Sequence, residues 1–259
     1  MLTVLCGVLG FPVAHSRSPA MMNAAFAELA MDWHYVHLPI APSRFAQTTR
    51  ALPASGYRGA NVTIPHKLAA HALADERSPA ARAIGAVNTL VFEPGGAIYG
   101  DNTDAGGLID AVGESDVRGR RALVLGAGGA GRAAVWALRE AGAEVAVWNR
   151  TPARAVELAR EFGVRAVDAP EPTDVLVNAT SVGLEGEDAE AELPLAEAAL
   201  VVDLVYGREA TSLERWALAR GARVVDGLEI LVRQGARSFE RWTGRQAPLD
   251  TMRQATACV

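Results

Sequence analysis

The clearest pattern of hydrophobic and polar positions lies between residues 121 and 150. Ala122 to Leu125 form an unbroken apolar run, which is typical of a strand buried on both faces of a sheet. Helical character follows over 133–140, and Gly142 is a typical residue at a helix C-terminus. Strand character returns over 144–148. The pattern therefore predicts one strand–turn–helix–strand unit.

The same alternation extends along the rest of the chain. Before this unit it predicts strands over 2–9, 33–40 and 59–63, and helices over 20–30, 43–52 and 108–112. After it, the pattern predicts helices over 152–162, 212–219, 228–243 and 249–257, and strands over 164–167, 174–178, 200–204 and 223–225. Residues 93–96 carry a hairpin-turn signal, 114–120 a polar surface connection, and 183–192 an acidic, mobile surface loop. These alternating elements predict an α/β fold with largely parallel sheets.

Three glycines occupy the turn of the strand–turn–helix–strand unit. Gly126, Gly128 and Gly131 match the G-x-G-x-x-G pattern, between a strand and a helix. The first glycine allows a tight turn, the second lets a pyrophosphate approach the backbone, and the third lets the helix pack on the strand. Helix N–H groups and the helix dipole then face the phosphates. The alternative is an ordinary glycine-rich turn, but the context favours a dinucleotide site.

The end of the next strand indicates which dinucleotide binds. An NAD site usually has an acidic residue about 20 residues after the glycines, where it holds the ribose 2′-hydroxyl. This chain has Asn149, Arg150 and Thr151 there, and Arg154 follows one helical turn later. Guanidinium groups suit a phosphate dianion, so the sequence predicts NADP. The alternative is a solvated helix start, which the helix dipole disfavours for positive charge.

Composition and charge exclude several classes of function. The net charge is −5 and no basic block occurs, which argues against nucleic acid or an anionic membrane as a partner. No apolar stretch approaches the roughly 20 residues of a membrane span. The N-terminus lacks basic residues before its apolar run, so we expect a strand there instead of a signal peptide. We expect a cytoplasmic protein with a small-molecule substrate, either a monomer or a homodimer.

Cysteine and histidine usage predicts neither a disulfide nor a metal site. Cys6 and Cys258 lie at opposite ends of the chain. All five histidines precede the glycine-rich unit, and their spacing matches no known metal site.

Three polar turns in the first half of the chain carry candidate residues for ligand binding or catalysis. Ser18 before Pro19 is typical of a helix N-cap, whereas the hydroxyl of Ser16 is available to hold an anionic ligand such as a carboxylate. Pro65 is a possible start for a helix that carries Lys67, although a lysine in a first helical turn is usually solvated. Asp104 has an equally ordinary interpretation as a first-turn helix acid.

Taken together, these turns make the chain resemble the shikimate dehydrogenase family nearly from end to end. The motifs occur in the family's order: HSRSP at 15–19, NVTIPHK at 61–67, AVNTL at 86–90, DNTD at 101–104, GAGGAG at 126–131, NRT at 149–151, NATSVG at 178–183 and QG at 234–235. Each motif alone is weak evidence, but their joint occurrence is specific. The chain departs from the family at Ala105, where glycine is usual, and at Gly207–Glu209, where a proline-containing turn is common.

The resemblance implies a fold and a set of site residues. It implies an N-terminal α/β substrate domain over 1–102, completed by C-terminal helices over 230–259, a Rossmann-type NADP-binding domain over 103–229, and a cleft between them. Lys67 matches the family's catalytic lysine and Asp104 its partner. The substrate positions are Ser16, Ser18, Thr63, Lys67, Asn88, Asp104, Tyr206 and Gln234. The cofactor positions are Gly126, Ala127, Gly128, Gly129, Ala130, Asn149, Arg150, Thr151, Arg154, Leu204 and Gly227.

The resemblance also implies a reaction, the reversible NADPH-dependent reduction of 3-dehydroshikimate to shikimate in aromatic amino-acid biosynthesis. One alternative is a broader quinate/shikimate dehydrogenase that uses NAD, against which the absence of an acid at Asn149 argues. Another alternative is a non-catalytic NADP-binding sensor, which would need neither Lys67 nor Asp104.

Overall fold

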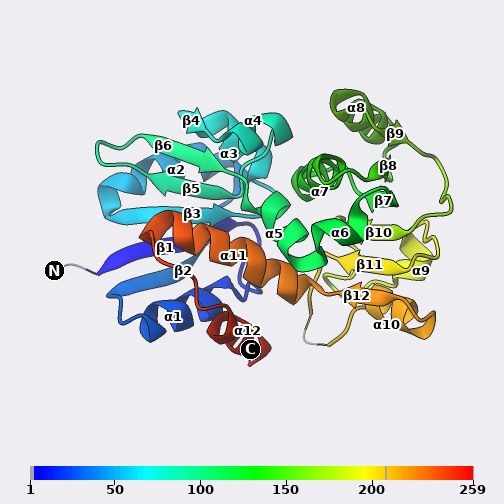
Figure 1. The fold of residues 1–259 in the computed structure, drawn as a ribbon. Coiled ribbons are helices and arrows are strands. Elements are labelled where there is room, and N and C mark those ends of the chain that lie inside the picture. Colours follow the sequence, from blue (N-terminus) through cyan, green and yellow to red (C-terminus); the bar gives the residue numbers. More distant parts are fainter. Residues whose placement is uncertain (1–2, 208, 259) are drawn as a thin grey trace. The chain divides into compact units, whose positions relative to one another are not determined.

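The computed structural model describes residues 3–207 and 209–258, and its contacts divide the chain into two compact units (Figure 1). The first unit comprises residues 1–103 and 231–259, and the second comprises residues 104–230. The chain leaves the first unit after Thr103, the first residue of a helix, and returns to it at Leu231 within another helix.

The first unit is built on a mixed six-stranded sheet with the order β2-β1-β3-β5-β6-β4. Its strands are β1 (Val4–Gly10), β2 (Trp33–Pro39), β3 (Tyr57–Val62), β4 (Glu76–Arg77), β5 (Thr89–Phe92) and β6 (Ile98–Asp101). Strand β1 runs parallel to β2 and β3, whereas β5 runs antiparallel to β3 and β6. The predicted hairpin between β5 and β6 is confirmed, with Gly95 and Gly96 at positive φ.

Helices cover both faces of this sheet. They are α1 (Ser18–Glu28), α2 (Phe45–Ala51), α3 (Lys67–Leu73), α4 (Pro79–Ile84), α11 (Gly227–Thr243) and α12 (Leu249–Ala257), with 3₁₀ turns η1 (Pro42–Arg44) and η2 (Pro53–Ser55). One core lies among α1, α11, α12 and the sheet, and the other lies under α2, α3 and α4. Along β5, Val91 belongs to the first core while Leu90 and Phe92 belong to the second, as the alternation of a strand requires.

Two helix starts differ from the sequence prediction. Helix α1 begins at Ser18 with Arg17 as its N-cap, so the prediction that Ser18 is the cap was wrong. The Oγ of Ser16 instead accepts a hydrogen bond from the Ser18 N–H at 3.3 Å. Helix α3 begins at Lys67 and not at Pro65, because the N–H of His66 closes a turn on Thr63 O at 2.9 Å and leaves the proline outside the helix.

The second unit holds a six-stranded, wholly parallel sheet with the order β12-β11-β10-β7-β8-β9. Its strands are β7 (Arg121–Leu125), β8 (Glu144–Trp148), β9 (Arg165–Ala166), β10 (Val175–Asn178), β11 (Leu200–Asp203) and β12 (Arg223–Val225). Numbered within the unit, this is the 3-2-1-4-5-6 order of a dinucleotide-binding fold, in which ligands bind where the order reverses. The reversal lies between β7 and β10.

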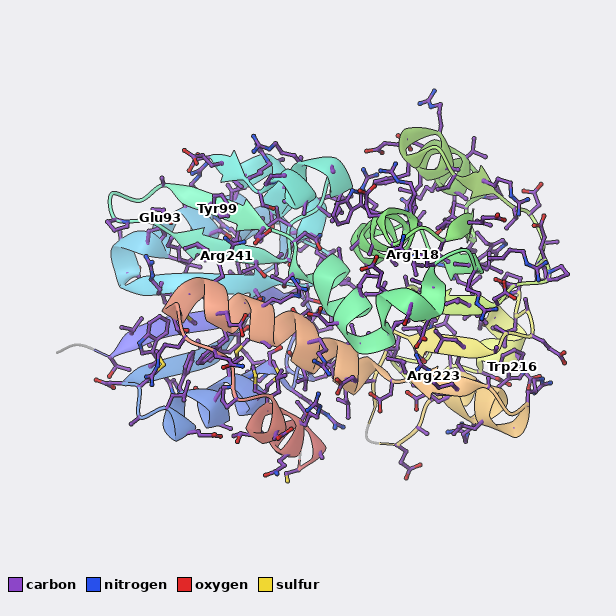
Figure 2. The ribbon with its side chains drawn as sticks, viewed as in Figure 1. Glu93, Tyr99, Arg118, Trp216, Arg223 and Arg241 are labelled. Atoms are coloured by element: carbon purple, nitrogen blue, oxygen red, sulfur yellow. The ribbon has the colours of Figure 1, made fainter. Side chains whose placement is uncertain are left out.

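Helices of the second unit are α5 (Thr103–Val112), α6 (Glu114–Val117), α7 (Gly129–Glu140), α8 (Pro152–Phe162), α9 (Ala189–Glu192) and α10 (Ser212–Ala219). Helix α7 begins four residues before its predicted start, so the last three residues of GAGGAG form its first turn. The regions expected to be a connection and a mobile loop each contain a short helix, α6 and α9. Arg223 at the start of β12 (Figure 2) bonds to Val112 O at 2.9 Å and to Asp116 at 3.0 Å, and so fastens the end of α5 and helix α6 to this strand.

No helix within the described residues is long and apolar enough to cross a membrane.

Candidate active site

The three glycines of the glycine-rich turn differ in how much space surrounds their Cα atoms. A Cβ at Gly126, which has a φ of 111°, would lie 2.8 Å from Ala179 O in the loop after β10. A Cβ at Gly131 would clash with Gly126 O. A Cβ at Gly128 would meet nothing within 4 Å. The fold itself therefore requires Gly126 and Gly131, whereas the bare backbone at Gly128 leaves room where a pyrophosphate approaches.

This turn lies at the reversal of strand order. Gly126 follows β7, and its close neighbour Ala179 follows β10, the strand on the other side of the reversal. Gly128 is the N-cap of α7 and supplies no side-chain cap, so Gly129 and Ala130 present first-turn N–H groups without a capping side chain. Such N–H groups bind phosphate oxygens.

The tip of β8 is fastened to the glycine turn by Asn149. Its Oδ1 accepts a hydrogen bond from the backbone N–H of Ala127 at 3.1 Å, and its Nδ2 donates to Thr151 O at 3.0 Å. Sequence reasoning treated Asn149 as a ligand contact and missed this positioning role. Arg150 and Arg154 are both exposed, and neither forms an ion pair with another residue of 3–207 or 209–258. Their charge is available to an anionic ligand.

In the first unit, the turn that holds Ser16 and Ser18 is secured from two other elements. His37 Nε2 on β2 donates a hydrogen bond to Ser16 O at 2.9 Å. The guanidinium of Arg17 donates to Thr256 O, at the end of α12, at 2.8 Å. Ser18 is buried at the start of α1, and Ser16 is half-buried.

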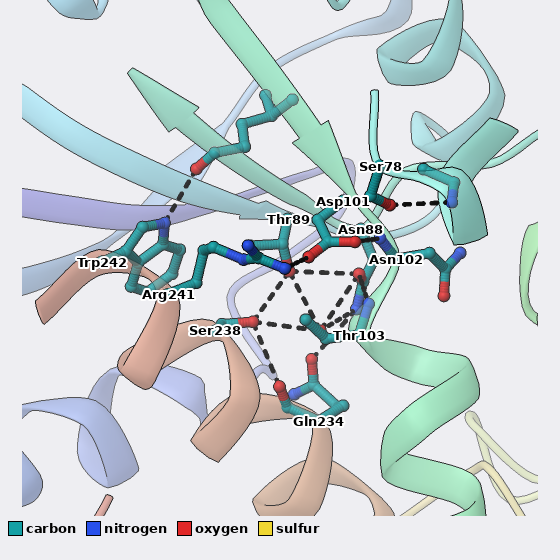
Figure 3. A network of polar contacts seen from close by, with 12 residues as sticks. Ser78, Asn88, Thr89, Asp101, Asn102, Thr103, Gln234, Ser238, Arg241 and Trp242 are labelled. Atoms are coloured by element: carbon teal, nitrogen blue, oxygen red, sulfur yellow. Dashed lines mark hydrogen bonds and ion pairs between the residues drawn. The ribbon is translucent and has the colours of Figure 1, made fainter. Parts of the chain in front are cut away.

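Asn88 lies at the centre of a buried polar network (Figure 3). Its Oδ1 accepts a hydrogen bond from the backbone N–H of Thr103 at 2.7 Å, which fixes the direction of the amide because that N–H can only donate. Its Nδ2 donates to Gln234 Oε1 at 3.2 Å, and Gln234 Nε2 donates to Leu231 O at 2.8 Å. Two side chains that the resemblance assigns to the substrate are thus held together by one network.

Three hydroxyl groups support this amide pair. Those of Thr89, Thr103 and Ser238 lie 2.8 to 3.1 Å from one another, and Asn61 Nδ2 donates to Ser238 Oγ at 2.8 Å. Sequence reasoning missed all four residues as parts of the site. One available signal was Ser238, a polar residue one helical turn after Gln234 on the same face of α11.

Side chains at the end of α11 attach this helix to the sheet. Arg241 pairs with the buried carboxylate of Asp101 at 2.5 Å, and its guanidinium carbon lies 5.8 Å from the centre of the Tyr99 ring (Figures 2 and 3). Trp242 Nε1 donates to Leu90 O at 2.9 Å, in space that the absence of a side chain at Gly59 leaves open. The position of Gln234 therefore depends on several anchors along one helix.

Lys67 is the first residue of α3 and is half-buried. Its carbonyl accepts a hydrogen bond from the N–H of Val87 at 3.0 Å, one residue before Asn88. Its neighbour His66 is buried, donates from Nε2 to Ile40 O at 2.7 Å and stacks on Phe45 with ring centres 4.4 Å apart. The start of α3 is thus held rigidly from two sides.

Residues 87 and 88 therefore contact the first residue of α3 and the first residue of α5. Val87 holds the carbonyl of Lys67, while the side chain of Asn88 holds the N–H of Thr103, and Asp104 is the next residue in the chain. Thr63 begins the turn between β3 and α3, and its N–H donates to Leu9 O at 2.8 Å.

Lys67 is also the only lysine among the 25 lysines and arginines of the chain. Arginine cannot release its proton in a protein, whereas a lysine ammonium can, so a proton-transferring role needs lysine at this one position. Sequence reasoning did not use this signal, although it was present in the composition.

In the second unit, Asp203 organises the segment that carries Leu204 and Tyr206. Its buried carboxylate accepts hydrogen bonds from Thr211 Oγ1 at 2.7 Å, Asn178 Nδ2 at 2.9 Å and Val205 N at 3.0 Å. Burial raises the pKa of Asp203 to about 6, and these three hydrogen bonds oppose that rise. The loops after β10 and β11 are thereby joined at their bases.

Gly227 starts α11 beside this segment. A Cβ there would clash with Val205 O, so the close approach of the two backbones requires glycine. Leu204 is half-buried, and its N–H donates to Asn178 O at 3.0 Å. Arg208, in the turn where the chain departs from the family pattern, lies outside the described residues.

Within residues 3–207 and 209–258, no three His, Cys, Asp or Glu side chains are grouped closely enough to hold a metal ion.

Three family models match successive parts of the chain. The shikimate dehydrogenase substrate binding domain matches residues 8–90, shikimate/quinate 5-dehydrogenase matches residues 110–183, and the shikimate 5′-dehydrogenase C-terminal domain matches residues 227–256. The three matches lie in the same order as the motifs that suggested the family.

Relatives of similar length agree with these models. The chain is 46% identical to a shikimate dehydrogenase (NADP(+)) of Anaeromyxobacter dehalogenans, over 98% of this chain and 95% of the relative. It is 50% identical to the enzyme of the same name from Thermus thermophilus, over 92% and 91%. The crystal structure of Thermus thermophilus shikimate 5-dehydrogenase in complex with NADP(H) and shikimate has a TM-score of 0.88 at 44% identity, covering 98% of each chain.

Proposed function

The chain belongs to the shikimate dehydrogenase family, and on that basis we propose that it reversibly reduces 3-dehydroshikimate to shikimate with NADPH in aromatic amino-acid biosynthesis. The observation that carries this proposal is the similarity to the Thermus thermophilus enzyme, whose crystal structure was determined in complex with NADP(H) and shikimate. The two chains are 44% identical, and their structures have a TM-score of 0.88. The geometry of this chain's own residues supports it at each of the two ligand positions.

The second unit is suited to hold NADP. The open backbone at Gly128 and the first-turn N–H groups of α7 would receive the pyrophosphate. The exposed guanidinium groups of Arg150 and Arg154 would bind the 2′-phosphate, and Thr151 would contact it from the start of α8. Bound NADPH supplies the hydride.

The first unit supplies most of the proposed substrate contacts. Ser16 and Ser18 bind the carboxylate at the start of α1, while Asn88 and Gln234 hold ring hydroxyls from the buried network. Thr63 contributes from the turn before α3, and Tyr206 from the segment after β11. Neutral donors and acceptors of this kind suit a polyhydroxylated acid, because each can pair with one hydroxyl.

Lys67 and Asp104 perform the proton transfer in this proposal. Reduction of a ketone places negative charge on its oxygen, which must be stabilised and protonated. The ammonium of Lys67 donates that proton, and the carboxylate of Asp104 orients the ammonium. In the oxidative direction the same amine accepts the proton from the hydroxyl.

The second candidate function is a broader quinate/shikimate dehydrogenase that uses NAD, since one matching family model carries both substrates in its name. The absence of an acidic residue at position 149 favours NADP over NAD. A non-catalytic NADP sensor, the third alternative, does not account for a single lysine at position 67.

The test is a steady-state assay of the purified chain with shikimate and with quinate, each with NADP⁺ and with NAD⁺. We expect the highest kcat/KM with shikimate and NADP⁺. Comparable efficiency with quinate and NAD⁺ would favour the broader dehydrogenase, and NADP⁺ binding without turnover of either acid would favour the sensor.

A further inference from the structure

The last helix of the chain lies against the turn that carries Ser16 and Ser18. Helix α12 packs along α1, and both contribute to the same hydrophobic core, with Met252 from α12 and Met21 and Met22 from α1 (Figure 1). Arg17 at the start of α1 bonds to Thr256 near the end of α12, while Thr251 near the start of α12 bonds to Glu28 at the end of α1. The two helices therefore run antiparallel.

This arrangement places opposite helix ends side by side. The N-terminus of α1 carries partial positive charge, whereas the last carbonyls of α12 carry partial negative charge. A carboxylate held at Ser16 and Ser18 would be attracted by the first and repelled by the second. Arg17 lies between Ser16 and Ser18 in the chain. Its buried guanidinium donates a hydrogen bond to one of the last carbonyls of α12, at 2.8 Å.

We propose that Arg17 is a positioning residue, which binds the last turn of α12 and thereby holds Ser16 and Ser18 in place for the carboxylate of the substrate. The inference rests on the proposed function, because it concerns how the same substrate is held. It extends the substrate site to a helix that contributes no contact residue of its own.

Two contacts of the same turn support this role. Arg17 is the N-cap of α1, and its carbonyl accepts the N–H of Met21 at 3.2 Å, so its backbone sets the direction of the first helical turn. Ser16 Oγ accepts the N–H of Ser18, which couples the two hydroxyl-bearing residues to each other. Displacement of Arg17 would therefore move both serines together.

The chain offers a matched control at the opposite end of α1. Arg245 also donates from its guanidinium to a backbone carbonyl, that of Leu29 at the C-cap of α1, at 3.0 Å. The same substitution at both arginines removes the same kind of bond, once beside the serines and once far along the helix from them.

The experiment compares Arg17→Met, Arg17→Lys and Arg245→Met with the wild type, using shikimate and shikimate methyl ester, the latter as substrate or as competitive inhibitor. We expect Arg17→Met to raise the KM for shikimate about 10-fold, the lower limit for loss of a hydrogen bond to a charged group. The kcat at saturating shikimate and the KM for NADP⁺ should change little. Binding of the ester, which lacks the negative charge, should change much less than binding of shikimate.

Arg17→Lys keeps the charge but not the planar fork, so its ratio of shikimate to ester affinity should lie between those of the wild type and Arg17→Met. Arg245→Met should leave that ratio unchanged. If the ratio of shikimate to ester affinity stays unchanged in the Arg17 variants that fold, this inference is overturned, whereas the proposed function is not. A wild type that does not turn over shikimate with NADP⁺ would overturn the proposed function, and this inference with it.

Discussion

The backbone N–H of Ala127 donates a hydrogen bond to the side-chain oxygen of Asn149 at 3.1 Å. This bond joins the glycine-rich turn to the tip of β8, the two places where the second unit is expected to hold the pyrophosphate and the 2′-phosphate of NADP. The amide nitrogen of Asn149 reaches in the other direction, to Thr151 O. One side chain thus fixes the glycine-rich turn relative to the start of α8.

Asn149→Asp should shift the preference from NADP towards NAD. A carboxylate oxygen can still accept from Ala127, so the glycine turn should keep its place. The new negative charge would bind the ribose hydroxyl of NAD and repel the 2′-phosphate of NADP. We expect the ratio of kcat/KM with NADP⁺ to that with NAD⁺ to fall about 10-fold or more, as for the loss of one charged contact. Asn149→Ala is the control, and it should weaken both cofactors because the acceptor is lost.

Arg150→Ala should weaken NADP and leave NAD nearly unchanged. A charge-assisted hydrogen bond to a phosphate contributes about 1.5–3 kcal/mol, so the KM for NADP⁺ should rise roughly 10–150-fold. Arg160 is an exposed arginine in the last turn of α8, the helix that follows Arg150, and Arg160→Ala should affect neither cofactor. Equal weakening of both cofactors by Arg150→Ala would mean that the arginine supports the loop and does not bind the phosphate.

Alanine at Gly128 and at Gly131 should have opposite consequences. Gly128 has a φ of −83° and open space around it, so Gly128→Ala should change the free energy of unfolding by less than about 0.5 kcal/mol while it weakens NADP⁺ binding. Gly131→Ala places a methyl group against Gly126 O and should destabilise the chain by about 1–3 kcal/mol. Thermal denaturation without cofactor measures the first quantity, and fluorescence titration with NADP⁺ measures the second. Loss of stability at Gly128 would show that its bare backbone serves the fold.

The second unit could be predicted closely because its signals are local. The apolar run of β7, the three glycines and the amphipathic α8 lie within about 40 residues, and each element's period is visible in the sequence. The predicted bounds of β8, α8, α10 and β12 agree with the structure. The late predicted start of α7 has a simple cause, because glycine has low helix propensity and the first turn of this helix contains two glycines.

The polar network around Asn88 could not be predicted in the same way. It joins residues 61, 88, 103 and 238, which are brought together only by the mixed sheet and by the return of the chain in α11. No periodic pattern relates such distant positions. The motifs that carried the resemblance identified Asn88 and Gln234 but not the hydroxyl groups that hold them. At Ser18 the error is of the opposite kind. A local signal predicted the helix N-cap at this residue, whereas the N-cap lies one residue earlier in the chain.

Asp203 should make the stability of the chain fall as the pH rises from about 4 to 7. Its pKa is raised by burial from 3.8 to about 6, so the folded chain binds this proton more tightly than the unfolded chain does. Stability is therefore greatest below the unfolded pKa and is lost as the pH rises through the folded pKa. A shift of about two units corresponds to about 3 kcal/mol. The raised pKa of Glu214, also caused mainly by burial, adds a slope of the same sign.

The measurement is urea denaturation of wild type and Asp203→Asn at several pH values. The carboxamide does not titrate, so the difference in the free energy of unfolding between the two proteins should change by about 3 kcal/mol over this range. Asp75, whose pKa is lowered to about 2 mainly by its bond to Arg50, is present in both proteins, so its contribution cancels in the difference. A difference that stays constant with pH would contradict the assignment to Asp203.

Lys67 can be tested with two substitutions that separate charge from proton transfer. Lys67→Met keeps most of the side-chain volume but removes the amine, and Lys67→Arg keeps the positive charge but cannot release a proton. If Lys67 is the acid and base, both variants should lose roughly 10²–10⁴-fold in kcat, while the KM for shikimate changes far less. If only its charge matters, Lys67→Arg should retain most of the turnover.

Asp104→Asn tests whether Asp104 acts together with Lys67. The carboxamide cannot orient the ammonium as a carboxylate does, so the variant should lower kcat. The double variant Lys67→Met with Asp104→Asn should lose less than the product of the two single effects if the residues act as one unit. Multiplicative losses in kcat would show that the two residues act independently.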